Sequence, residues 1–232
     1  MIKNLFIDLD DTLWATYQNS QESMYEVYKK HNWSEYISDY ETFWQRYWSI
    51  NEGLWEEYRQ GRINKHQLKT ERFRKLFSGI KEWDDNAILS FNNDFLTGTT
   101  TKTALVPGGI EVLSYLHRYY RIYILSNGFR EVQSAKINRS GLAPYIDRII
   151  LSEDAGCNKP HRGIFQYAFS VTNSRGSESI MIGDSWEADI EGAHNASIPS
   201  IWFNPKENPL PQQSKAEPLH IIKDLKELLS IF

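Results

Sequence analysis

The sequence predicts an α/β fold in which helices cover both faces of a parallel sheet and a helical segment is inserted after the first strand. Two observations support this fold class. From about residue 106 onward, short apolar runs typical of buried strands alternate with amphipathic helical patterns. Between residues 16 and 97, strand-like runs disappear and aromatic-rich helical patterns replace them. We therefore expect a sheet-based domain formed by residues 1–15 and 98–232, and an inserted helical domain formed by residues 16–97.

The first strand is the short apolar run Leu5–Ile7, which ends at Asp8. Asp10 and Asp11 follow directly in the sequence. Carboxylates at the mouth of a buried strand lose hydration and repel one another, so a cation, hydrogen-bond donors or a reaction must compensate them. A solvated aspartate-rich turn after an edge strand is the alternative interpretation of this stretch taken alone.

The inserted segment carries a stripe of aromatic residues that share one helix face, namely Tyr40, Phe43, Trp44, Tyr47 and Trp48. Such a stripe is typical of packed core rather than of a cofactor site. A break after Gly61 and a capping pair at Asp84 and Asp85 indicate further helices, which would form a small bundle with short connections. The threonine-rich residues 97–101 are expected to be a linker.

The remaining elements follow in alternating order. We expect strands at residues 121–125, 148–151, 179–182, 200–203 and 219–222. Helices are expected at residues 106–117, 131–139, 161–171, 187–195 and 225–231. Glu153 and Asp154 are expected in a charged loop, and residues 205–218, with four prolines, in a surface loop.

Composition limits the class of protein. The chain has 232 residues and a formal net charge of −4, which does not indicate binding to nucleic acid or anionic membranes. Its one cysteine, Cys157, excludes an internal disulfide and fits a reducing compartment. No apolar run approaches the roughly 20 residues of a membrane span, and no signal peptide is recognisable. We expect a cytoplasmic monomer or homodimer whose partner is a small molecule, with no nucleic acid polymer and no membrane.

Polar side chains follow four of the predicted strands, and the carboxyl ends of parallel strands meet at one edge of a sheet. In chain order they are Asp8 and Asp10; Ser126, Asn127 and Gly128; Lys159; and Asp184 with Asp189. Carboxylates are the oxygen ligands that Mg²⁺ prefers, while a hydroxyl, an ammonium and main-chain N–H groups can surround phosphate oxygens. The pattern favours phosphoryl transfer through a covalent carboxyl-phosphate, with one aspartate moving protons.

At these residues the chain resembles the haloacid dehalogenase (HAD) superfamily. The matching motifs, in order, are DLDDT (8–12), SNG (126–128), NKP (158–160) and GDSWEAD (183–189). The resemblance implies a Rossmann-like core with a helical cap inserted after the first strand. It implies Asp8 as nucleophile and Asp10 as general acid and base, with Ser126 and Lys159 binding phosphate. It also implies that Mg²⁺ is held by the Asp8 carboxylate, the Asp10 carbonyl and Asp184, with Asp189 supporting the metal or its waters.

Within the superfamily the chain looks most like the pyrimidine 5′-nucleotidase branch. The similar stretches are NEGLW (51–55), YRQG (58–61), SEDAG (152–156) and WFNP (202–205). The resemblance implies a phosphatase of nucleoside 5′-monophosphates. In the helical segment, Asn51, Leu54 and Trp55 are the candidates for contacting a base or sugar, with packing inside the cap as an equal alternative for each.

Asp10 favours a phosphatase over a dehalogenase. A dehalogenase attacks carbon and has no ester oxygen to protonate, and its family pattern lacks a second aspartate at this position. The expected activity is therefore Mg²⁺-dependent hydrolysis of phosphate monoesters through an aspartyl-phosphate. Phosphatases of sugar phosphates or other small metabolites, a phosphomutase and a non-catalytic ligand-binding member of the fold stay open as alternatives.

Overall fold

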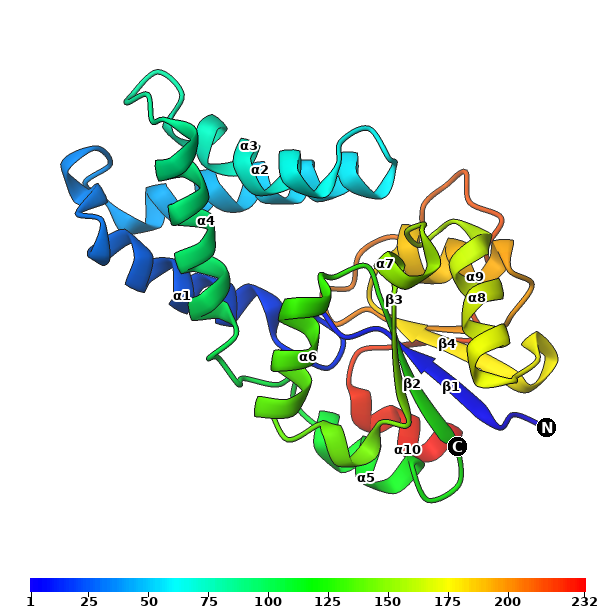
Figure 1. The fold of residues 1–232 in the computed structure, drawn as a ribbon. Helices are drawn as coiled ribbons and strands as arrows, with labels where there is room; N and C mark the ends of the chain where they lie inside the picture. Colours follow the sequence, from blue (N-terminus) through cyan, green and yellow to red (C-terminus); the bar gives the residue numbers. More distant parts are fainter. The chain divides into compact units, whose positions relative to one another are not determined.

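The computed structural model describes all 232 residues, which form two compact units. Residues Met1–Thr16 and Thr103–Phe232 make up what we call the sheet unit, and residues Tyr17–Lys102 make up the helical unit (Figure 1). The linker predicted at residues 97–101 is wrong in its first half, because helix α4 (Asp85–Thr99) continues through it. The threonine hydroxyl of Thr99 donates to the carbonyl of Phe95 over 2.8 Å and so supports the last helical turn.

The sheet unit is built on six parallel strands in the order β3-β2-β1-β4-β5-β6. The strands are β1 (Asn4–Ile7), β2 (Arg121–Ser126), β3 (Arg148–Leu151), β4 (Ser179–Gly183), β5 (Ser200–Phe203) and β6 (His220–Ile222). From β1 the chain adds β2 and β3 on one side of the sheet and then β4, β5 and β6 on the other, so the switch point of the topology lies between β1 and β4. Ligands of open α/β sheets bind beyond the carboxyl ends of the strands at this switch point. The predicted α/β fold class with a parallel sheet is confirmed.

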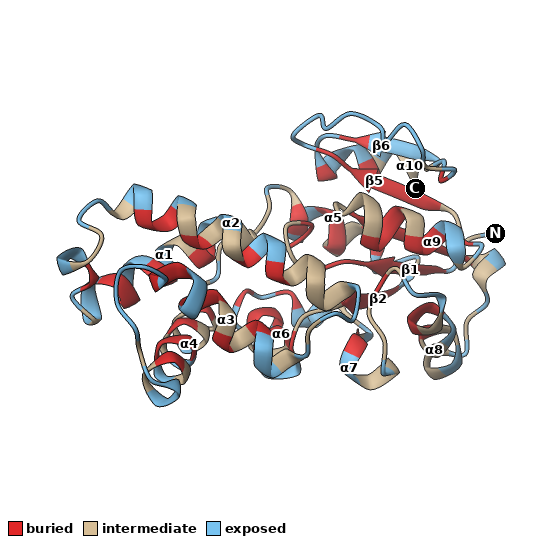
Figure 2. Cartoon of the chain, turned by 90° about the horizontal axis from the view of Figure 1, so that it is seen from above, coloured by how far each residue is buried: buried red, intermediate tan, exposed pale blue.

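Successive residues of the central strands face two separate apolar cores. Leu5 and Ile7 pack in one core with α5 (Gly109–Leu116), α6 (Arg130–Arg139) and α10 (Leu228–Ile231). Phe6 packs in the other core with α8 (Arg162–Thr172) and α9 (Gly192–Asn195). Figure 1 shows these helices on the two faces of the sheet, and Figure 2 shows that the strands between them are almost entirely buried. Burial on both faces explains why the strands read as continuous apolar runs.

Two segments near the carboxyl edge of the sheet differ from the predictions. The sequence predicts one helix over residues 187–195, but the chain forms a π-helical turn at Trp186–Glu191 before α9 begins. The wider turn carries Asp189, whose carboxylate accepts a hydrogen bond from the main-chain N–H of Ser185 over 3.1 Å. The expected charged loop at Glu153 and Asp154 is a short helix, α7 (Ser152–Ala155).

The helical unit contains the expected bundle. Its helices are α1 (Thr16–Lys30), α2 (Tyr40–Arg59), α3 (Lys65–Phe77) and α4. The predicted helix starts are confirmed, because Asn64 and Gln67 form a reciprocal capping box on α3 and Asp84 caps α4. The predicted core role of the aromatic stripe is confirmed for its buried members, Phe43, Trp44 and Tyr47.

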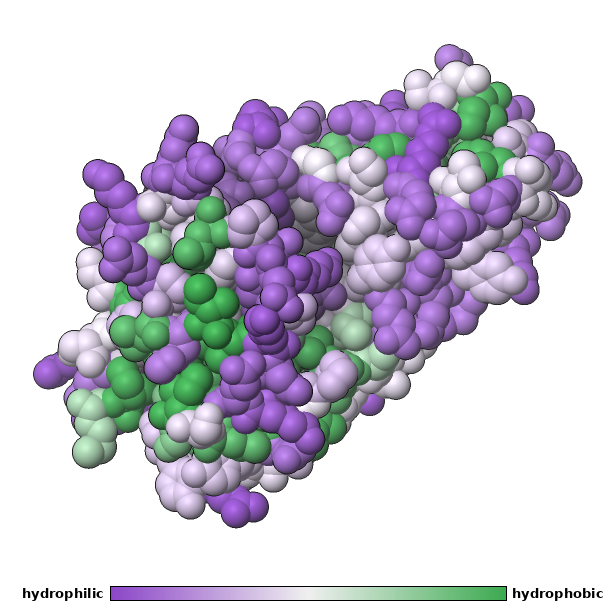
Figure 3. Space-filling view, turned by 180° about the vertical axis from the view of Figure 1, so that it is seen from behind, coloured by the Kyte–Doolittle hydropathy of each residue, from purple (hydrophilic) through white to green (hydrophobic).

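Apolar side chains are unevenly distributed over the surface. On the face drawn in Figure 3, hydrophilic side chains cover most of the area, and apolar ones gather in a large group toward the lower left and a smaller one at the upper right. The exposed apolar residues of the chain include Leu219, which directly precedes the edge strand β6, and Ile221, which lies in it. No helix has the length and apolar character that crossing a membrane requires.

Candidate active site

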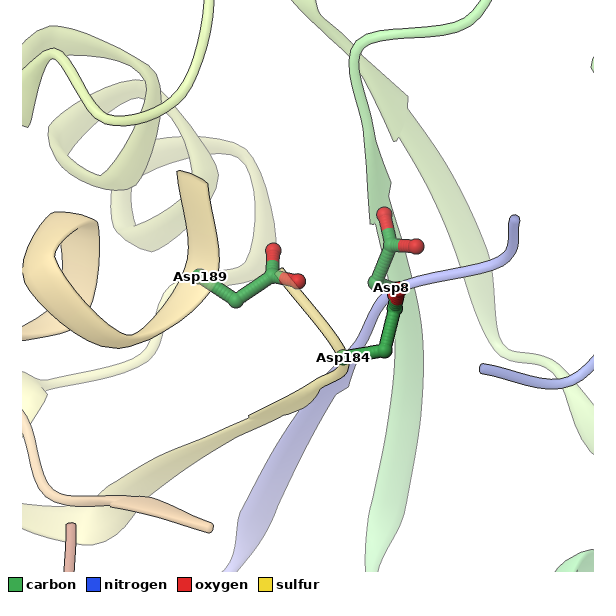
Figure 4. Close-up of side chains that lie close together, drawn as sticks. All are labelled: Asp8, Asp184 and Asp189. Atoms are coloured by element: carbon green, nitrogen blue, oxygen red, sulfur yellow. The ribbon is translucent and has the colours of Figure 1, made fainter. Parts of the chain in front are cut away.

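Three carboxylates meet beyond the carboxyl ends of β1 and β4. Asp8 follows β1 and Asp184 follows β4, and Asp189 reaches toward both strand ends from the π-helical turn (Figure 4). Carboxylate oxygens of these three residues lie within 4.8 Å of one another. Gly183 makes room for this arrangement, since a Cβ atom at that position would lie 2.1 Å from Oδ2 of Asp189.

One buried lysine faces the carboxylates. The Nζ atom of Lys159 donates to Oδ1 of Asp8 and to Oδ1 of Asp189, in both cases over 2.6 Å, and the side chain is 2% exposed. Burial alone would lower the pKa of Lys159, but the charges of Asp189 and Asp8 raise it above its ordinary value, so the group stays an ammonium. Lys159 thus pairs with two of the three acids, Asp8 and Asp189, and leaves Asp184 without this cation.

Asn127 fixes the main chain at Lys159. Its Nδ2 atom donates to the Lys159 carbonyl over 3.0 Å, and its Oδ1 atom accepts from the Lys159 N–H over 2.8 Å. These two bonds connect the segment after β2 to the segment before α8. They use both the amide nitrogen and the amide oxygen of the Asn127 side chain, whose predicted role in binding phosphate stays a prediction.

The carboxylate cluster is not electrically balanced by Lys159. Burial raises the pKa of Asp8, and repulsion from Asp189 and Asp10 raises it further. Lys159 lowers the pKa of Asp8 but offsets these effects only in part, so the pKa is about 7. Burial, with the charges of Asp8 and Asp189, likewise raises the pKa of Asp184 well above its ordinary value. Clustered hard oxygen donors with excess negative charge are the donor set that a divalent cation such as Mg²⁺ fits.

Asp10 lies outside this cluster and has its own partners. Its Oδ1 atom accepts hydrogen bonds from Thr16 Oγ1 over 2.9 Å and from the ammonium of Lys136, and its Oδ2 atom accepts from Nε2 of Gln133. Burial tends to raise the pKa of Asp10, but Lys136 and the hydrogen bonds from Gln133 and Thr16 lower it overall. Two carboxylates in one short motif therefore occupy opposite electrostatic environments.

Ser126 ends β2 with its hydroxyl almost fully buried. Its Oγ atom accepts hydrogen bonds from the Gly128 N–H over 3.0 Å and from Nε2 of Gln133 over 2.7 Å. A serine hydroxyl has two lone pairs and one proton. With both lone pairs in use, the hydroxyl can act toward a ligand only as a donor.

Three residues of this site were not among the predicted ones. Thr12 exchanges hydrogen bonds with Asp184, donating to its Oδ1 over 3.0 Å and accepting from its main-chain N–H over 3.1 Å. Gln133 and Lys136 contact Asp10 from α6. On α6 they share a face with Ile137 and Ser140, and a face that is mostly polar resembles a solvent-exposed one in the sequence. In the sequence, only the distance of Gln133 and Lys136 from the SNG motif (126–128) could distinguish them from surface residues.

The residues predicted to contact a base or sugar lie on α2 in the helical unit. Oδ1 of Asn51 accepts a hydrogen bond from Arg72 over 3.3 Å, and Leu54 is buried. Trp55 is half-buried and packs edge-on against Tyr58, with ring centroids 5.6 Å apart. Their role toward a substrate stays a prediction.

Comparisons with known proteins give the family. A family model for haloacid dehalogenase-like hydrolases matches residues 2–197. The pyrimidine 5′-nucleotidase PynA of Streptococcus pneumoniae is 30% identical over 72% of this chain and 70% of its own length. The N-acylneuraminate-9-phosphatase of Homo sapiens is 25% identical over 98% of this chain and 92% of its own length.

A solved structure agrees with this assignment over the whole chain. The crystal structure of YfnB from Bacillus subtilis bound to magnesium matches with a TM-score of 0.88 and 26% identity. The match covers 99% of this chain and 98% of the other. The chain therefore belongs to the haloacid dehalogenase-like hydrolase family, and it is an enzyme of that family's phosphatase type.

Proposed function

We propose that this enzyme hydrolyses small phosphate monoesters through an aspartyl-phosphate on Asp8, with Mg²⁺ as cofactor and pyrimidine nucleoside 5′-monophosphates as substrates. The observation that carries the proposal is the contrast between two carboxylates. Asp8 contacts a buried ammonium beside two further carboxylates, and Asp10, two residues on, is held apart by separate donors. A nucleophile and a separate proton-moving group are what hydrolysis of a phosphate monoester in two steps needs.

The residues divide the reaction between them. In the first step a carboxylate oxygen of Asp8 attacks phosphorus and the bond from phosphorus to the ester oxygen breaks. Asp10, which has to take up a proton when the substrate binds because its pKa is lowered in the free enzyme, gives that proton to the ester oxygen. In the second step water attacks the same phosphorus and gives a proton to Asp10. The bond from phosphorus to Asp8 then breaks, and inorganic phosphate is released. Lys159 and the Ser126 hydroxyl are the groups that bind the phosphate oxygens, where negative charge is spread in the transition state.

Mg²⁺ would be held by the carboxylates of Asp8 and Asp184 and by the main-chain carbonyl of Asp10, with Asp189 supporting it. The fit rests on the three clustered carboxylate side chains, at which burial, together with repulsion from neighbouring acids, raises the pKa of Asp8 to about 7. When bound, the ion supplies positive charge that keeps Asp8 ionised and reduces its repulsion of the phosphate.

The substrate class is supported by the relatives. The similarity to a pyrimidine 5′-nucleotidase favours a nucleoside monophosphate. The similarity to an N-acylneuraminate-9-phosphatase, which extends over almost the whole chain, makes a sugar phosphate the second candidate. In our proposal residues 16–97 are the cap, and residues 1–15 with 98–232 are the catalytic core. Asn51, Leu54 and Trp55 are then the candidate contacts to the part of the substrate that leaves.

Release of inorganic phosphate from a panel of monoesters tests the proposal. We expect activity with uridine 5′-monophosphate that needs Mg²⁺, and loss of at least about 10³-fold in kcat for Asp8→Asn, because the amide is not a nucleophile. Glu178→Gln is the control and should match the wild type in kcat, because this partly exposed acid pairs with Lys3 at the opposite end of the sheet.

The outcomes separate the candidates. Retained turnover in Asp8→Asn would rule out the mechanism. A higher kcat/KM for sugar phosphates than for pyrimidine monophosphates would move the assignment to the second candidate. An isomerised phosphate ester in place of inorganic phosphate would indicate a phosphomutase.

A further inference from the structure

Two polar side chains of α6 are buried against the active site. Gln133 is 1% exposed and Lys136 is 5% exposed, although a glutamine and a lysine on a helix of this type normally face water. They are three residues apart and therefore lie on neighbouring turns of one helix face. Both donate to the carboxylate of Asp10. Their burial is thus accompanied by specific hydrogen bonds to the proposed general acid and base.

Gln133 connects two functional groups. Its Nε2 atom carries two hydrogens, and the structure gives it two acceptors, Oδ2 of Asp10 and Oγ of Ser126. Because Ser126 also accepts from the Gly128 N–H, the contact with Gln133 fills its second lone pair. The same amide therefore orients the Asp10 carboxylate and leaves the Ser126 hydroxyl as a donor.

Lys136 fixes the other oxygen of Asp10. Its ammonium bonds to Oδ1, where Thr16 also donates, and it stands 4.1 Å from the centroid of the Trp14 ring. The ammonium therefore contacts both the Asp10 carboxylate and the face of the Trp14 ring. With donors on both oxygens, rotation of the Asp10 carboxylate breaks at least one hydrogen bond.

We propose that Gln133 and Lys136 are positioning residues that together hold the Asp10 carboxylate in one orientation, and that Gln133 couples this orientation to the Ser126 hydroxyl. The inference rests on the proposed function, since it concerns how Asp10 meets the ester oxygen. Gly128 contributes to the same arrangement by leaving space for the Gln133 side chain. A Cβ atom there would lie 2.3 Å from Nε2 of Gln133, so only glycine leaves the amide in place.

Esters with different leaving groups test the role of Lys136. The 5′-oxygen of uridine 5′-monophosphate leaves only with a proton, whereas p-nitrophenolate leaves unaided. We expect Lys136→Met to lower kcat for uridine 5′-monophosphate at least about tenfold and kcat for p-nitrophenyl phosphate less than about threefold. Lys136→Arg should recover most of the loss. Arg139→Met, an exposed cation on the same helix, should behave as wild type.

Gln133→Met tests the coupling. Like Lys136→Met, it should lower the ratio of kcat for uridine 5′-monophosphate to kcat for p-nitrophenyl phosphate. It should also lower kcat for both esters by a common factor, because the Ser126 hydroxyl loses the hydrogen bond from Gln133. In an Asp10→Asn background, Lys136→Met should no longer change the ratio, since the group that it orients is absent. Thermal melting of each variant shows that it is folded.

Equal losses with both esters, or an unchanged effect of Lys136→Met on the ratio in the Asp10→Asn background, would overturn the inference while the phosphatase assignment stands. A wild-type protein inactive on both esters would instead contradict the proposed function and this inference with it.

Discussion

Asp8 and Asp10 are two residues apart, yet their pKa values shift in opposite directions. The pKa of Asp8 rises to about 7 because it is buried beside other carboxylates. The pKa of Asp10 falls, in spite of burial, because Lys136, Gln133 and Thr16 bind it. The lowered pKa keeps Asp10 ionised, which suits it to accept a proton from the attacking water, whereas Asp8 needs added positive charge, such as that of a bound cation, to be a carboxylate at neutral pH.

The shift of Asp8 makes the stability of the metal-free protein depend on pH. A carboxyl group whose pKa is raised on folding, from about 3.9 in the unfolded chain, stabilises the fold below that value and loses this contribution as pH rises through about 7. We expect the melting temperature in a metal chelator to fall between about pH 4 and pH 7, the range between the two pKa values, and to level off above it. Asp8→Asn should flatten this fall, and an equally steep fall in that variant would contradict the assignment.

The repulsion among the three carboxylates gives a second prediction. Asp184→Asn keeps the size of the side chain and an oxygen to accept from Thr12, but removes one negative charge. Without metal at pH 7.5 we expect the variant to melt at a higher temperature than the wild type, because a buried charge is lost. Added Mg²⁺ should raise the melting temperature of the wild type by several degrees and that of the variant by much less. Equal metal shifts in both proteins would exclude Asp184 as a ligand.

At the scale of elements, the turn after β4 decides where Asp189 lies. A side chain at Gly183 would collide with Asp189, and the collision includes its Cβ atom at 2.7 Å as well as the carboxylate. Rotation of the carboxylate alone does not relieve this contact, so the π-helical turn must shift. Gly183 is therefore needed for the close approach of the Asp189 side chain to the end of β4 rather than for its own conformation.

Gly183→Ala should destabilise the protein by about 1–3 kcal/mol, the range of an overpacked core site, and should weaken the stabilisation by Mg²⁺. Chemical denaturation with and without the ion measures both effects. Gly53→Ala is the matched control, since a Cβ at that helical position meets no atom within 4 Å. The control should be stabilised by about 0.5–1 kcal/mol. A Gly183 variant as stable as the wild type would show that the turn adjusts freely.

Sequence patterns predict the strands and most of the helices because burial on two faces and end-capping leave local signals. Residues 148–151 and 200–203 form strands with the predicted bounds, and the start of α3 at Asn64 follows its capping box. The π-helical turn leaves no such signal, because the hydrogen bonds that hold Asp189 come from Lys159 and Ser185. Gln133 and Lys136 are missed for the same reason, since only the folded sheet brings Asp10 to them.

At the scale of the whole molecule, the helical unit and the sheet unit each have a core of their own. In the helical unit the Phe43 ring packs against Tyr28 and Trp33, with centroids 4.9 Å and 5.3 Å away. In the sheet unit Phe165 is fully buried in the core under α8. Separate cores predict that damage to one unit can be confined to it.

Phe43→Ala tests this organisation, with Phe165→Ala as the reciprocal variant. Each truncation removes a fully buried ring and should destabilise its unit by about 3–5 kcal/mol. We expect hydrogen exchange followed by mass spectrometry to show faster exchange in residues 17–102 for Phe43→Ala. For Phe165→Ala the faster exchange should lie in residues 1–16 and 103–232, with the other unit protected as in the wild type. Phe43 lies in the core of the helical unit, whereas β1 and β4 belong to the sheet unit and carry Asp8 and Asp184 at their ends. Loss of protection in β1 and β4 of the Phe43 variant would therefore mean that the two units unfold as one cooperative structure, and that the carboxylate cluster depends on the core of the other unit.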